Sequence, residues 1–131
     1  MTLHVELVSP EKVLFQGEAD MVVCRPSDGD IAFLPGHTPY LGALGIGVLR
    51  VLLPDSGELE FAVHGGFVEV ANDRVLVLSD VAEVPDQIDV ARARSAKERA
   101  EAAISGGDES DETKEALQRA NTRLAVAGVN A

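Results

Sequence analysis

The chain has 131 residues, of which 46% are hydrophobic and 25% charged, and its formal net charge is −11. This composition is typical of a folded protein with a modest core, so a largely disordered chain is excluded. The acidic balance argues against a general nucleic-acid binder, because phosphate backbones require a cationic surface. No apolar run approaches the roughly 18 residues that a membrane-spanning helix needs.

The start of the chain lacks the features of a signal or transit peptide, and the single cysteine, Cys24, leaves no internal disulfide to form. We therefore expect a protein that works in the reducing compartment where it is made. Cys24 lies among valines, which predicts a half-buried structural thiol and not a reactive one.

Residues 1–87 predict a series of short strands. Leu3, Val5 and Leu7 alternate with His4 and Glu6, which is the period-two pattern of a half-buried strand. The pattern continues further along, with apolar positions at Val13, Phe15, Met21 and Val23 and water-facing positions at Glu18 and Asp20.

Turn signals then recur every eight to twelve residues, at 27–30, 35–36, 54–57 and 72–73. The segments 46–53 and 58–63 predict a hairpin in which Gly57 supplies the positive φ, and Gly65 and Gly66 interrupt the strands that follow. The glycine-rich run 42–47 predicts a turn leading into a strand. Together these signals indicate an antiparallel sandwich or barrel.

The segment 34–44, LPGHTPYLGAL, contains two prolines that make it a stiff loop. Two interpretations remain open on the residues alone. The segment is either a rigid crossover between strands or an exposed docking surface, since a stiff loop loses little entropy on binding.

The character of the chain changes after Pro85. Residues 1–87 carry a net charge of −10 and residues 88–131 a net charge of −1. Asp86 predicts the N-cap of a helix that runs to about Ser105, since the segment lacks Gly and Pro and is rich in Ala, Glu and Arg. Gly106 and Gly107 end it, and Ser110 caps a second helix, so we expect an antiparallel helical hairpin.

Basic residues gather on this hairpin. Asp89, Arg92 and Arg99 share one face of the first helix, and Arg119 and Arg123 share one face of the second. If the hairpin closes, four guanidiniums converge and suit the oxygens of a phosphate ligand. Alternatively, the arginines form solvated ion pairs with acidic neighbours on the same helix, each worth ~0.2–0.5 kcal/mol.

No catalytic or metal-binding constellation is visible. His4, His37 and His64 have no cysteine or carboxylate at metal-ligand spacing, and the chain lacks both a nucleophile elbow and a phosphate-binding P-loop. We expect no catalytic residue and no metal site.

The order of GDIAFLPGHTPYLGALGIGVLRV, HGGFVEV and RVLVLSDVAEVPDQIDVARARSAKERAEAAI resembles the epsilon subunit of the rotary F-type ATP synthase over essentially the whole chain. The resemblance implies an α+β protein with an N-terminal β-sandwich of about ten antiparallel strands, residues 1–85, and a C-terminal two-helix hairpin, residues 86–131. It also implies a non-catalytic rotor subunit on the cytoplasmic side of the cell membrane, held there only through the complex.

In that family the sandwich binds the gamma subunit and sits on the ring of c subunits. The hairpin can extend along gamma, towards the alpha and beta subunits, and restrain ATP hydrolysis. Asp30 and His37 match positions that face the ring. Some bacterial members bind ATP on the folded hairpin as a regulatory ligand, with no cofactor required. The matching positions here are Glu83, Asp89, Arg92, Ala93, Arg99, Arg119 and Arg123.

One alternative from a different class is a free-standing nucleotide-responsive binding module that belongs to no rotary complex. Co-purification with the gamma subunit distinguishes the rotor-subunit hypothesis from this alternative, because a free-standing module would purify alone.

Overall fold

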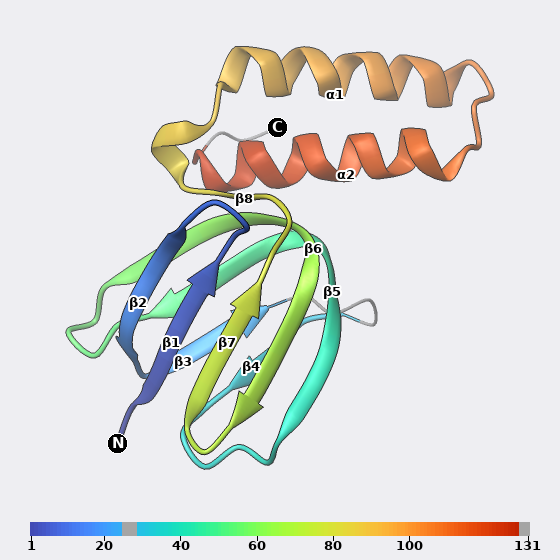
Figure 1. Cartoon of the computed structure of the whole chain (residues 1–131). Helices are drawn as coiled ribbons and strands as arrows, with labels where there is room; N and C mark the ends of the chain where they lie inside the picture. The colour runs from blue at the N-terminus through green and yellow to red at the C-terminus, as the bar shows by residue number, and fades with distance from the viewer. Residues whose placement is uncertain (25–28, 129–131) are drawn as a thin grey trace.

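The computed structural model describes residues 1–24 and 29–128. It confirms the α+β architecture: a two-layered, strand-rich unit lies beneath a pair of helices (Figure 1). The described strands are β1 (Leu3–Val8), β2 (Val13–Ala19), β3 (Met21–Cys24), β4 (Ile31–Phe33), β5 (Tyr40–Leu52), β6 (Glu58–Ala71), β7 (Arg74–Leu78) and β8 (Ala82–Glu83). A 3-10 turn (Pro85–Gln87) leads to α1 (Val90–Ser105) and α2 (Asp111–Val126).

The strands form one continuous hydrogen-bonded sheet in the order β2-β1-β7-β6-β5-β3-β4, with β8 added against β6. All pairs are antiparallel except β1 and β7, which are parallel. The expectation of an entirely antiparallel sandwich is therefore wrong at this one pair. The two strands lie far apart in sequence, so no tight turn forces them to run in opposite directions.

The described residues contain eight strands, fewer than the ten or so expected. The difference lies in β5 and β6, which have 13 and 14 residues and run through both layers. Their register is the same on either side of the glycines, with Leu44 opposite Gly66 and Ile46 opposite His64. The glycines predicted to interrupt the strands instead allow one long hairpin to bend. The turn predicted at 42–47 is not observed, because these residues belong to β5.

Gly66 shows why glycine is needed at this bend. Its φ is +128°, and a Cβ atom there would collide with the carbonyl oxygen of Leu78 on the neighbouring strand. Gly65 also has a positive φ, +90°, but open space around its Cα. The close approach of β7 therefore restricts position 66 more severely than position 65.

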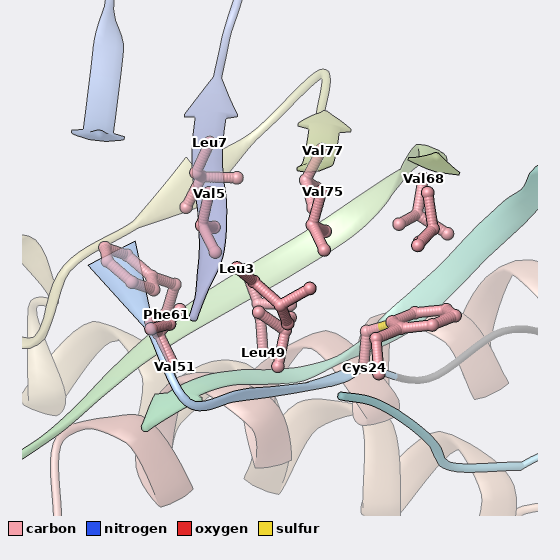
Figure 2. Close-up of a cluster of buried hydrophobic side chains, with 14 of the residues drawn as sticks. Leu3, Val5, Leu7, Cys24, Leu49, Val51, Phe61, Val68, Val75 and Val77 are labelled. Carbon is pink, nitrogen blue, oxygen red and sulfur yellow. The ribbon is translucent and has the colours of Figure 1, made fainter. Parts of the chain in front are cut away.

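The core lies between the two layers (Figure 2). The predicted alternation in β1 is confirmed, since Leu3, Val5 and Leu7 are fully buried. Burial of such a side chain stabilises the fold by about 1.5–3 kcal/mol. Cys24 is also buried, more deeply than the half-buried position expected for it.

The predicted face of β3 is wrong, whereas in β2 Val13 departs from the prediction and Phe15 packs against the core as expected. Val22 and Cys24 are the buried residues of β3, not Met21 and Val23, and Val13 at the start of β2 is 53% exposed. All four residues of β3 are apolar, so alternation could not distinguish its two faces. Glu18 and Asp20 face water as expected.

Two turn assignments also change. In the β5–β6 turn, Ser56 has the positive φ of +73°, in place of Gly57. The turn at Asn72 and Asp73 is confirmed, and both residues have positive φ. The turn predicted at 27–30 lies partly outside the described residues.

The helical hairpin is confirmed, with a different start. Asp89 is the N-cap of α1, and its carboxylate accepts a hydrogen bond from the backbone nitrogen of Arg92 at 3.0 Å. Asp86, the predicted cap, lies in the 3-10 turn that precedes the helix. Ser110 caps α2 as expected. The helices run antiparallel, with α2 packed on β5 and β6 and α1 on the far side of α2 (Figure 1).

The stiff loop is shorter than predicted. Residues from Tyr40 onward belong to β5, so only residues 34–39 form the loop. The backbone nitrogen of Gly36 donates to the Asp73 carboxylate at 2.7 Å, which fixes the loop to the β6–β7 turn.

Candidate functional site

A hollow of about 330 Å³ lies where β8 and the 3-10 turn meet the two helices. All seven positions predicted for a nucleotide line it. The complete lining is Glu83, Gln87, Asp89, Arg92, Ala93, Ala96, Arg99, Ala116, Arg119 and Arg123. The volume is at the lower end of the ~300–1,000 Å³ typical of small-molecule sites.

The side of the hollow made by α1 combines small and basic side chains. Ala93 and Ala96 leave room, and Arg92 and Arg99 follow at helical spacing. The Asp89 carboxylate accepts from the backbone of Arg92 and is not ion-paired with its guanidinium. Among the described residues no ion pair involves Arg92 or Arg99, so both are available to an anionic ligand.

The α2 side of the hollow carries two arginines in different surroundings. Arg119 Nη1 lies 3.9 Å from Glu115 Oε2, a loose pair on the surface of the helix. Arg123 Nε donates to Glu83 Oε1 at 2.7 Å, and thereby joins α2 to β8. This contact is short and only partly exposed, so it stabilises more than the Arg119 pair.

Glu83 accepts a second hydrogen bond, from His64 Nε2 at 2.9 Å. Burial opposes ionisation of Glu83, but the hydrogen bonds from Arg123 and His64 outweigh it and lower the pKa of the carboxyl. Burial is also the main reason that the pKa of His64 is lowered, so the imidazole is neutral at neutral pH. The carboxylate is thus ionised and held between two donors.

Four guanidiniums against the carboxylates of Glu83 and Asp89 give the hollow a net positive charge in an otherwise acidic protein. Arginine forks match phosphate oxygens in geometry and charge, so the arrangement suits a polyphosphate. The described residues hold no group of three or more His, Cys, Asp or Glu side chains arranged to bind a metal ion.

The two residues predicted to face a ring of c subunits are not brought together. Asp30 borders a separate hollow, of about 580 Å³, against the opposite side of α2. His37 lies in the loop after β4, where its ring packs edge-on against Phe33 at a centroid distance of 5.0 Å. The loop contacts the β6–β7 turn, away from the helices (Figure 1).

Sequence reasoning missed two residues of this region. His64 lies directly after three buried residues, Phe61, Ala62 and Val63, and an apolar run before a histidine was the available signal for its burial. Gln118 donates from its side chain to the carbonyl oxygen of Ile46 at 2.9 Å. Its partner is 72 positions away, so no local pattern indicated the contact.

Two family models together match almost the whole chain. Residues 2–85 match the β-sandwich domain of the ATP synthase delta/epsilon chain, and residues 86–128 match its long α-helix domain. The chain belongs to the ATP synthase delta/epsilon chain family. This confirms the resemblance seen in the sequence motifs.

Curated relatives of this family member are named ATP synthase epsilon chain. That of Halalkalibacterium halodurans is 44% identical over 131 residues, covering 97% of this chain and 98% of the relative. That of Thermobifida fusca is 45% identical over 128 residues, covering 95% and 91%. That of Desulforudis audaxviator is 48% identical over 107 residues, covering 82% and 77%.

Solved structures share the fold at low identity. A chain of the Euglena gracilis mitochondrial ATP synthase, from a structure of OSCP, F1 and the c-ring, superposes with a TM-score of 0.82 and 22% identity, covering 96% of this chain and 81% of that one. A chain from a structure of the Tetrahymena thermophila mitochondrial ATP synthase central stalk and c-ring superposes with a TM-score of 0.63 and 13% identity, covering 97% of this chain and 97% of that one. Within the described residues, neither helix of this family member is long and apolar enough to cross a membrane.

Proposed function

We propose that this chain is a non-catalytic rotor subunit whose strand-rich unit, residues 1–85, connects the gamma subunit to the c-ring. Its hairpin, residues 86–131, regulates ATP hydrolysis and senses ATP. On this proposal the chain reaches the cytoplasmic side of the membrane only through the complex, and it requires no cofactor. The observation that carries the proposal is an exposed apolar stripe on the outer face of the sheet.

The stripe crosses five neighbouring strands. Direct partners in the strand register are Val13 with Val8, Val8 with Leu78, Leu78 with Phe67, and Phe67 with Ala43. Directly opposed residues point to the same face, so these side chains form one surface. Phe67 is 58% exposed, Val13 53% and Leu78 48%. A continuous apolar surface of this kind marks a protein interface, and we assign it to gamma.

The loop around His37 supports a second contact. It lies at the end of the strand-rich unit away from the helices, and its tip is fixed by the bond from Gly36 to Asp73. The loop presents the polar side chains of His37 and Thr38, which suit the polar loops of a c-ring. Asp30 borders the hollow beside α2, so its part in this contact stays a prediction.

The hairpin rests on the sandwich through a small interface. Its apolar part consists of Ala62, Ile88 and Val126, with Val48 and Ala127 at the edge. Such an area stabilises docking far less than the main core stabilises the sandwich. A hairpin held in this way is suited to leave the sandwich and extend along gamma towards the alpha and beta subunits.

ATP bound between the helices would favour the folded hairpin and oppose inhibition of hydrolysis. Arg92, Arg99, Arg119 and Arg123 line the hollow and would bind the phosphates, and Glu83 and Asp89 offer acceptors to donor groups of the nucleotide. Both helices contribute arginines, so a ligand that contacts them all requires the hairpin to be closed. A ligand shifts the equilibrium only by its difference in affinity between the two positions.

The stripe can be tested by co-purification of gamma with the full chain. Phe67→Glu places a charge at the centre of the stripe, and we expect it to reduce recovery of gamma at least tenfold. Leu34→Glu is the matched control, because Leu34 is 51% exposed and lies outside the stripe. Equal recovery of gamma with both variants would exclude the stripe as the gamma surface.

The second candidate function, a free-standing nucleotide-responsive module, is favoured by the basic hollow alone. The same experiment separates the two, since a module outside the rotary complex recovers no gamma even with the unmodified chain.

A further inference from the structure

His64 is a buried histidine for which the proposed function has no use. Its side chain is 4% exposed, and its Nε2 lies 2.9 Å from Glu83 Oε1. The other ring nitrogen, Nδ1, is buried and has no hydrogen-bond partner among the described residues. The neutral tautomer with its proton on Nε2 fits this environment, because a proton on Nδ1 would be a buried donor without an acceptor.

The same carboxylate oxygen is shared between the sandwich and the hairpin. Glu83 Oε1 accepts from His64 on β6 and, at 2.7 Å, from Arg123 on α2. The hydrogen bond from His64 on β6 therefore fixes the position of the Glu83 side chain, and the Glu83 carboxylate in turn fixes the position of the Arg123 guanidinium. Three elements that are distant in sequence meet at one oxygen atom.

The Glu83–Arg123 hydrogen bond contributes a large share of the interactions that dock the hairpin on the sandwich. The buried apolar cluster between the hairpin and the sandwich consists of Ala62, Ile88 and Val126, and within the described residues the other side-chain hydrogen bond from α2 to the sandwich is donated by Gln118 to Ile46. A hydrogen bond between charged groups contributes more than a neutral one. Loss of the Glu83–Arg123 bond should therefore change the docked population measurably.

The charges that face His64 come from two elements. Glu83 on β8 attracts a proton to the ring, whereas Arg123 and Arg119 on α2 repel it. Glu115, also on α2, lines the same hollow as His64 and is paired with Arg119. When α2 is docked, a protonated His64 therefore lies near two arginines, with a buried proton on Nδ1 that nothing accepts.

We propose that His64 is a pH-sensitive positioning residue: when neutral it holds Glu83 against Arg123 and keeps the hairpin docked, and when protonated on Nδ1 it keeps its bond to Glu83 but places a positive charge beside Arg119 and Arg123, which drives release of the hairpin. Undocking removes both arginines and admits water to the ring, so the undocked state accepts the proton more readily. Acid thus shifts the hairpin towards its extended position. The inference rests on the proposed mobility of the hairpin and does not depend on ATP binding.

The sign of the linkage follows from the His64 pKa, which burial lowers in the docked state. The undocked ring has a pKa nearer the ordinary value of about 6.5. Between the two pKa values the undocked state binds more protons, so its population rises as pH falls. One proton changes the ratio of undocked to docked chains by at most about tenfold per pH unit.

The test measures the position of the hairpin by single-molecule energy transfer between two dyes. Glu69→Cys on β6 and Glu101→Cys on α1 provide exposed attachment sites on the two units. The native Cys24 is buried, and burial with the Asp30 carboxylate raises its pKa to about 12, so it does not compete for dye. The full chain is measured without nucleotide from pH 8 to pH 5.

We expect one population at pH 8 and a second, more distant one that grows as the pH falls below about 6.5, by no more than about tenfold per pH unit. His64→Gln keeps a neutral donor near Glu83 and cannot be protonated, so its second population should not grow. His4→Gln is the matched control, since His4 lies on β1 beside Glu6 and Glu18, and it should respond like the unmodified chain. If His64→Gln does not fold, His64→Ser replaces it.

Glu83→Gln distinguishes failure of the inference from failure of its premise. This variant should populate the distant state at every pH, because Arg123 loses its charged partner. If it opens the hairpin while acid does not, the hairpin is mobile but the role of His64 is wrong. If neither opens it, the hairpin is not mobile and both the inference and that part of the proposed function are overturned.

Discussion

Arg123 and Glu83 form the shortest side-chain hydrogen bond between the hairpin and the sandwich among the described residues, with 2.7 Å between Nε and Oε1 across 40 positions of sequence. Arg123 also lines the basic hollow, so it contributes both to docking of the hairpin and to the proposed nucleotide site. Arg123→Ala should therefore weaken both. Arg92 lines the same hollow without such a bond, which makes it the better probe of ligand binding.

We predict that Arg92→Ala weakens ATP binding more than tenfold. A lost charge-assisted contact costs on the order of 1.5–3 kcal/mol. Calorimetric titration of the isolated chain with ATP measures the change. Arg94→Ala is the control, because Arg94 is an exposed arginine of α1 that does not line the hollow. If both variants bind ATP as the unmodified chain does, the site assignment is wrong.

We predict that stability falls in two steps as pH decreases. Burial lowers the pKa of His64 in the fold, so the unfolded chain binds more protons below about 6.5 and stability is lost between there and the lower folded pKa. The pKa of Glu83 is lowered as well, because the Arg123 and His64 bonds outweigh burial, so its contribution is lost as pH falls from the ordinary value of 4.5 through the folded pKa.

Urea denaturation at a series of pH values from 8 to 3 measures both steps. His64→Gln should abolish the first step and retain the second. Parallel loss of stability in the variant and the unmodified chain between pH 7 and pH 5 would show that His64 is not the group responsible.

We predict that Gly66→Ala destabilises the fold more than Gly65→Ala. Both have positive φ, for which a residue other than glycine costs roughly 1–2 kcal/mol. At Gly66 the added Cβ also meets the carbonyl oxygen of Leu78, and relieving such overpacking costs roughly 1–3 kcal/mol more. Thermal denaturation ranks the two variants. Equal melting temperatures would show that the contact with the Leu78 carbonyl oxygen adds nothing to the cost of Gly66→Ala.

We predict that Cys24 is nearly unreactive in the native protein. Burial, with a smaller contribution from the Asp30 carboxylate, raises the pKa of the thiol to about 12, and the thiolate is the reactive form. Its reaction with a chromogenic disulfide at pH 8 should accelerate at least a hundredfold in denaturant. The exposed thiol of Glu101→Cys supplies the fast reference rate, and a native Cys24 that matched it would contradict the burial.

The sequence alone determined the features that depend on near neighbours. Alternation identified the buried face of β1 at Leu3, Val5 and Leu7, and Ser110 marked the start of α2. The helical spacing of Asp89, Arg92 and Arg99 identified one wall of the hollow, and that of Arg119 and Arg123 the other. Each of these signals spans only a few residues, so the chain carries it before any tertiary contact forms.

Only the tertiary structure decided how β5 and β6 continue through both layers, which face of β3 is buried, and that β1 and β7 run parallel. It alone showed that His64 and Arg123 share one oxygen of Glu83, from 19 and 40 positions away. The physical reason is the same in each case. These arrangements depend on which distant segments exclude water from one another when the layers close and α2 docks, and no local pattern of residues encodes that choice.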